Sequence, residues 1–132
     1  MEERLSNYQN HIEMENLIIY QKSYKLAMDI FFLTRSFPKE ETYSLVDQVR
    51  RSSRSVCVNF GEGYRKRKYP KNFLSRMTDA DGECTETMIH LSFSKDCGYI
   101  SEETYNKLKN EYQEVGRMLG AIINNPTNFI KA

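Results

Sequence analysis

The sequence predicts an all-α protein, an antiparallel four-helix bundle with up-down-up-down order. Three observations lead to this fold. Apolar residues recur at steps of three and four along four stretches of about 20 residues, which is the helical period. Proline, glycine or asparagine stands at each of the short junctions between the stretches. No stretch alternates apolar and polar residues as a half-buried strand would.

The first helix is predicted to begin at Glu15 and to end before Pro38, because the residue before a proline avoids the α-helical region. The second is predicted from Glu40 to Glu62, with acids in its first turn near the positive end of the helix dipole. Gly63 is expected to end it in the left-handed conformation. The predicted buried face of the first helix consists of Leu17, Tyr20, Tyr24, Ala27, Phe31 and Thr34, and Ile30 and Leu33 are expected to widen it.

The third helix is predicted to begin at Pro70, which suits the first turn of a helix, and to end at Gly98. Gly82 lies inside it, and a close approach between helices is the expected reason for that glycine. Ser101 is the predicted N-cap of the fourth helix, which ends before Pro126. The predicted divisions of the chain are a loose arm (1–13), the bundle (14–125) and a short tail (126–132).

Charge is close to balanced, with 19 basic and 18 acidic residues, but residues 50–71 hold eight basic residues and one acid, Glu62. Such a local patch can attract phosphates or acidic protein surfaces. Cys57, Cys84 and Cys97 are widely spaced and are predicted to be free core thiols of a reducing compartment. Neither a membrane span nor a signal sequence is predicted, so we expect a cytoplasmic protein.

Catalytic and metal sites find no support in the residue pattern. A carboxylate-bridged metal centre in a bundle needs Glu-x-x-His pairs on two helices, whereas His90 follows Glu86 by four residues. His11 falls in the predicted arm, and no cysteine pair has the spacing of a zinc site. His90 is interpreted as a helix-surface residue that pairs with Glu86. No catalytic residue, metal ligand or cofactor is therefore predicted.

The basic turn after the second helix is the clearest functional signal. Four consecutive cations at 65–68 lie between Tyr64 and Tyr69. Phosphates would meet the cations, and exposed tyrosine rings could stack on unpaired bases. The alternative is a solubilising turn whose charges suit the C-terminal end of the second helix. The residues predicted to contact nucleic acid are Arg50, Arg54, Arg65, Lys66, Arg67, Lys68 and Lys71.

A line of polar residues runs down the second helix, and its steps of three and four keep it within about 80° of arc. One interpretation is a solvated face. The other is contact with a neighbouring subunit, which is favoured slightly because glutamine, serine and asparagine are weak surface helix formers. The line consists of Gln48, Arg51, Ser55, Asn59 and Glu62.

Several short motifs keep a fixed register along the chain. They are FPKEE at 37–41, Leu45, Gln48, RR at 50–51, Ser55, Asn59, EGY at 62–64, A-x-G at 80–82 and Glu86. From about Leu17 to Ile123 the chain resembles the four-helix-bundle proteins encoded in intervening sequences of bacterial 23S ribosomal RNA genes, the S23 family. Several positions depart from the family pattern: Cys57 stands where the family usually has proline, Glu83 replaces a serine and Gly61 replaces an alanine. The loop after Tyr64 is one residue longer, and Tyr69-Pro70 stands in place of the usual serine cap.

The resemblance implies a homopentamer of bundles packed as a ring or barrel, with no assigned enzymatic activity. It also implies a relationship to the accessory variability protein of diversity-generating retroelements, a basic pentamer that binds nucleic acid and a reverse transcriptase. Because the polar line falls largely on family residues, Arg51, Asn59 and Glu62, joined by Glu86, become candidates for a network within or between subunits.

Two hypotheses of function follow. In the first, a non-enzymatic homo-oligomeric bundle binds nucleic acid, RNA in preference to DNA, through the basic turn, by phosphate neutralisation and shape without reading bases. In the second, the ring is a scaffold that recruits a protein such as a reverse transcriptase, and the basic patch is incidental. An enzyme with an unrecognised site is the least favoured alternative.

Overall fold

The protein is a bundle of four long helices in the computed structural model, which describes residue 11 and residues 13–130. The long helices are α2 (Ile18–Thr34), α3 (Asp47–Arg65), α4 (Pro70–Asp96) and α5 (Glu102–Asn124). Short helical segments are η1 (Lys39–Glu41), η2 (Thr42–Val46) and α6 (Thr127–Ile130). No strand occurs in the described residues, which confirms the predicted all-α class. Within the same residues, no helix has the length and apolar character needed to cross a bilayer.

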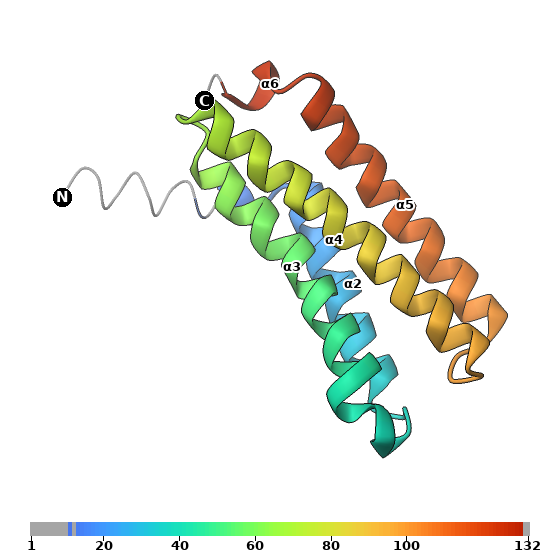
Figure 1. Cartoon of the computed structure of the whole chain (residues 1–132). Coiled ribbons are helices and arrows are strands. Elements are labelled where there is room, and N and C mark those ends of the chain that lie inside the picture. The colour runs from blue at the N-terminus through green and yellow to red at the C-terminus, as the bar shows by residue number, and fades with distance from the viewer. Residues whose placement is uncertain (1–10, 12, 131–132) are drawn as a thin grey trace.

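The long helices form two antiparallel hairpins, α2 with α3 and α4 with α5 (Figure 1). The chain reverses direction between each long helix and the next, which is the predicted up-down-up-down order. α3 makes its most extensive contact with α4, and α2 also touches α5. The four helices therefore enclose one core, and α2 and α4 lie diagonally across it.

The core consists of the inward faces of the four long helices. Ile30, Phe60, Met77 and Tyr112, one from each helix in turn, are at most 1% exposed. The inward face of α5 is buried throughout: Tyr105, Leu108, Tyr112, Val115, Leu119 and Ile122. Cys57 and Cys84 are buried free thiols as predicted, whereas Cys97, also free, is exposed at the end of α4.

The buried face of α2 differs from the predicted one. Tyr24 is 54% exposed, whereas Leu26, which lies outside the predicted face, is only 2% exposed. Apolar residues occupy most of the circumference of this helix, so its period alone did not select one face. The consequence is a set of large apolar side chains that α2 leaves exposed: Ile18, Tyr24, Met28 and Phe32.

The end of α3 also differs from the prediction, because the helix continues through Gly63 to Arg65. A Cβ atom at Gly63 would come within 2.4 Å of the Cε of Met77 and 2.9 Å of the Cβ of Arg76. Gly63 therefore allows the close approach of α4 and does not serve a left-handed turn. Among the described residues, Gly98 alone has a positive φ, 80°, and it follows α4 as predicted.

Local signals at two other helix ends are confirmed. Pro70 stands in the first turn of α4. The Oγ of Ser101 accepts a hydrogen bond from the backbone N–H of Thr104, 3.0 Å away, and caps α5. The expectation for Gly82 is wrong, because no atom lies within 4 Å of the place where its Cβ would stand. Nothing in the structure explains that glycine.

The described residues cover the predicted arm and the predicted tail only in part. Residues 1–10 and 12 of the predicted arm, and residues 131 and 132 of the predicted tail, lie outside the described residues. The described part of the tail forms α6, and the ring of Phe129 stacks on that of Phe73 with 6.2 Å between the centroids. The arm–bundle–tail division therefore stays a prediction.

Candidate nucleic-acid interface

The predicted basic turn joins the end of α3 to the start of α4. The backbone N–H of Lys66 donates to the carbonyl of Gly63 at 2.9 Å, and that of Tyr69 donates to the carbonyl of Lys66 at 2.8 Å. These two bonds close a tight turn, and α4 begins at Pro70 directly after it. The N-terminus of α4 therefore adjoins the turn, where its positive dipole end lies near the negative dipole end of α3, so the side chains carry the net positive charge.

Five of the seven predicted cations are exposed, namely Arg54, Arg65, Lys66, Lys68 and Lys71. In the part of the chain that the structure describes, none of these five forms an ion pair. Their charges are not compensated by a carboxylate in direct contact, so they are available to an anionic ligand.

Arg67 and Arg50 are instead held by the protein itself. Arg67 is 8% exposed, its Nε donates to the carbonyl of Tyr64 at 2.9 Å, and its guanidinium lies 3.7 Å from the Tyr64 ring centroid. The Nε of Arg50 donates to Thr34 at 2.9 Å, and its guanidinium lies 4.7 Å from the Phe31 ring centroid. These contacts join structural elements, so the five exposed cations are better placed for phosphates.

The two tyrosines that flank the turn differ in exposure. Tyr69 is 62% exposed, as expected, but Tyr64 is only 6% exposed and lies beside Phe60, with 6.2 Å between ring centroids. The expectation of an exposed ring is therefore wrong for Tyr64. Because α3 continues past Gly63, Tyr64 stands one turn after Phe60 on the buried stripe of the same helix.

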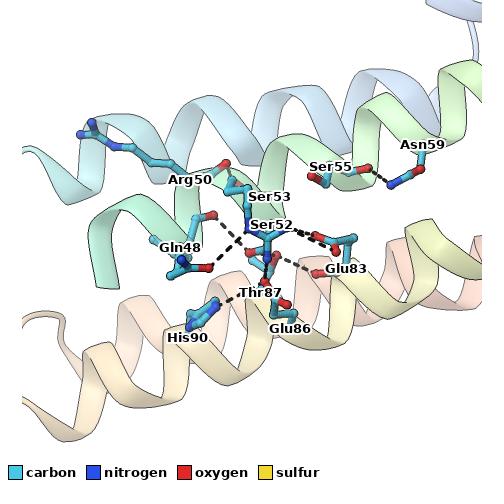
Figure 2. A network of polar contacts seen from close by, with 12 residues as sticks. Gln48, Arg50, Ser52, Ser53, Ser55, Asn59, Glu83, Glu86, Thr87 and His90 are labelled. Atoms are coloured by element: carbon cyan, nitrogen blue, oxygen red, sulfur yellow. Dashed lines mark hydrogen bonds and ion pairs between the residues drawn. The ribbon is translucent and has the colours of Figure 1, made fainter. Parts of the chain in front are cut away.

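The predicted polar line on α3 faces α4 of the same chain (Figure 2). An Nη of Arg51 donates to the carboxylate of Glu83 at 3.1 Å, and its other Nη contacts Glu86. The Nε of Arg51 donates to Gln48 at 3.4 Å on the same helix. Arg51 thus joins its own helix to two acids of α4.

Arg76 of α4 forms the other end of this network. It donates to the Oδ1 of Asn59 at 3.0 Å and pairs with Glu62 at 3.1 Å. The amide of Asn59 in turn donates to the backbone carbonyl of Ser55 at 2.9 Å. The predicted residues therefore make contacts within one chain, and a contact with another subunit stays a prediction.

His90 lies beside this network. Its Nε2 is 3.5 Å from a carboxylate oxygen of Glu86, the predicted pairing, but its side chain is only 19% exposed. The expectation of a surface residue is wrong, because His90 follows Glu83 by seven residues and so lies on the face of α4 that meets α3. Burial, and then the nearby charge of Arg51, lower the pKa of His90.

Sequence reasoning missed several partners of the polar line, and their spacing offered a signal. Below Arg51, the buried hydroxyl of Thr87 donates to that of Ser52 at 2.8 Å. The α4 partners follow one line of that helix at intervals of seven, four and three residues: Arg76, Glu83, Thr87 and His90. In the described residues, no three His, Cys, Asp or Glu side chains gather as a metal site would require.

Comparison with known proteins supports the resemblance. Residues 15–121 match the family described as "23S rRNA-intervening sequence protein". The chain belongs to this family. A similar solved structure is a protein of unknown function of the S23 ribosomal protein family from Bacteroides thetaiotaomicron VPI-5482, with a TM-score of 0.75 and 25% sequence identity. That match covers 82% of this chain and 96% of the Bacteroides chain.

No curated protein matches the sequence. The intervening-sequence family and the bundle fold are thus confirmed, and nothing in the comparisons indicates an enzymatic activity. The relationship of this family member to the accessory protein of retroelements stays a prediction.

Proposed function

We propose that this intervening-sequence protein is a non-enzymatic, homo-oligomeric bundle that binds RNA through the exposed cations at and near the α3–α4 turn. The observation that supports it best is the group of five exposed cations that form no ion pair with any residue the structure describes. Glu62 is the one acid of residues 50–71, and it pairs with Arg76 of α4 at 3.1 Å. Because Arg76 compensates the negative charge of Glu62, this carboxylate repels an incoming phosphate less.

RNA is favoured over DNA because the family description names a ribosomal RNA intervening sequence. The cations would neutralise phosphates without reading bases, since lysine and arginine contacts to the backbone carry no sequence information. Five phosphate contacts on a single strand give a slope of about −3.5 for the logarithm of affinity against that of salt concentration, at about 0.7 per contact.

The test is fluorescence anisotropy of labelled single-stranded RNA and of matched single-stranded DNA at several salt concentrations. A variant with Arg65, Lys66, Lys68 and Lys71 changed to serine is expected to lose most affinity and about 2.8 of the slope. The matched control changes four exposed cations elsewhere, Arg35, Lys39, Lys107 and Arg117, to serine and so removes the same charge. No binding by folded protein at low salt, or equal effects of the two variants, would contradict the proposal.

Exposed apolar side chains support the homo-oligomer and the alternative role as a protein scaffold. Phe32 on α2 is 57% exposed, and Ile89 and Phe93 on α4 are 50% and 58% exposed. Because α2 and α4 lie diagonally in the bundle, their outward faces differ, and contacts between different faces form a ring when the rotation from copy to copy closes. A reverse transcriptase is the partner that the family resemblance suggests for such a scaffold. The scaffold role is favoured over RNA binding if the folded oligomer does not bind RNA.

A further inference from the structure

An open groove of about 500 Å³ lies between α2 and α3, beside the basic turn. On the α2 side it is lined by Tyr20, Tyr24 and Met28, and on the α3 side by Val58. Tyr24 and Val58 are 54% and 55% exposed. The rings of Tyr20 and Tyr24 have centroids 5.9 Å apart and are tilted by 33°. The groove thus offers aromatic and aliphatic surface in a volume typical of ligand sites.

Cations stand at both ends of the groove. Arg54 and Arg65 both line it, and both are exposed. With Val58 and Gly61 they follow one face of α3 at steps of four, three and four residues. Eleven residues of helix place the two arginines about 16 Å apart along the axis. Arg65 also belongs to the basic turn, so the groove continues the surface proposed to bind RNA.

The floor of the groove depends on a small residue. A Cβ at Gly61 would stand 3.2 Å from the sulfur of Met14, closer than ordinary contact. The one acid of α3 at the groove, Glu62, is paired with Arg76 on α4. The site therefore combines an apolar, aromatic interior with a net positive rim. Such a site suits a planar nucleobase whose strand has backbone phosphates on both sides of it.

We propose that this groove receives an unpaired base of a bound RNA strand, stacked against Tyr24, with backbone phosphates further along the strand on either side of that base on Arg54 and Arg65. The inference rests on the proposed RNA binding and adds the form of RNA that is preferred. A base in a duplex is stacked on its neighbours and cannot enter, so the protein should discriminate single from double strands. It should not discriminate among bases, because every base has a face that stacks.

The test uses a single-stranded 12-nucleotide RNA with one central 2-aminopurine, and the same strand annealed to its complement. The protein contains no tryptophan, so the probe is seen without that background. Anisotropy reports binding, and 2-aminopurine emission reports stacking. We expect quenching on binding, and affinity for the single strand at least about 5-fold higher than for the duplex.

Two leucine variants make the test specific. Tyr24→Leu keeps an apolar side chain at an exposed position but removes the ring, so it should lose the quenching and the preference while the salt slope is retained. Tyr43→Leu removes a tyrosine that is 92% exposed and does not line the groove, and it should behave as the unchanged protein.

The possible failures are distinct. RNA that binds the unchanged protein and Tyr24→Leu alike, with equal quenching, overturns the base pocket but leaves the proposed function standing. No binding by the unchanged protein at low salt overturns both. A fall in oligomer mass in Tyr24→Leu, with strand preference unaltered, assigns the groove to contact between copies of the chain or with a partner helix and also overturns the pocket.

Discussion

The hydroxyl of Tyr99, after α4, donates a hydrogen bond of 2.8 Å to the carboxylate of Glu41, at the start of the helical region that leads into α3. The ring of Tyr99 also packs against Phe37, with 5.2 Å between centroids. These contacts join the two interhelical connections at one end of the bundle. Hydrogen bonds from Ser44 and from Tyr99 lower the pKa of Glu41, and the Glu41 bond raises the pKa of Tyr99 to about 12.

Tyr99→Phe is predicted to make the free energy of unfolding fall less steeply as the pH is lowered from 7 to below 4.5. The Glu41 carboxyl has a folded-state pKa below its usual 4.5, so its contribution is present above pH 4.5 and is lost as pH falls through the folded-state pKa. Removing the hydroxyl moves that pKa back toward the usual value. Urea unfolding at pH 7 and at several values below pH 4.5 should show the difference between the two proteins shrinking with acid. A constant difference would contradict the role of Glu41, and Tyr43→Phe serves as the control.

Arg67→Ala is predicted to lower the free energy of unfolding by about 2 kcal/mol, because a buried guanidinium over an aromatic ring is lost with its hydrogen bond. The guanidinium covers Tyr64 and donates to its carbonyl, so the substitution also opens a gap in the turn. Lys66→Ala, one residue earlier and exposed, should change stability by less than about 0.5 kcal/mol. Equal effects in urea unfolding would show that Arg67 has no structural part in the turn.

These two neighbours show where sequence reasoning reached its limit. In the sequence, Lys66 and Arg67 are equivalent members of one basic run. Their difference in burial depends on where α3 ends, and the glycines at 61 and 63 predicted an end too early. The helix continues because Gly63 serves packing against Met77, which is a contact between residues far apart in the chain. Local sequence patterns do not predict such tertiary contacts.

Local signals predicted the features that depend on neighbouring residues. Pro70 and Ser101 start α4 and α5 as expected, because a fixed proline φ and a capping hydroxyl act within one helical turn. The polar line of α3 was also visible, but its partner surface was not. Arg51 meets Glu83 and Glu86 only because α3 and α4 pack side by side. Similarly, the exposure of Tyr24 depends on which of several apolar faces of α2 the core accepts.

The same substitution at two glycines is predicted to have opposite effects. Gly82 is exposed in the middle of α4, and a Cβ there meets nothing within 4 Å. Gly82→Ala should therefore raise the free energy of unfolding by about 1 kcal/mol, since alanine is the better helix former and restricts the unfolded chain.

Gly63→Ala gains the same helix propensity but places a methyl group 2.4 Å from the Cε of Met77 and 2.9 Å from the Cβ of Arg76. The methionine end can turn aside, but the Cβ of Arg76 moves only with the α4 backbone, so the helices must separate. Overpacking of this kind costs about 1–3 kcal/mol, which should exceed the gain and leave a net loss of stability. Urea unfolding of both variants decides the point. If Gly63→Ala were as stabilising as Gly82→Ala, close packing of α3 on α4 would not be the reason for the glycine.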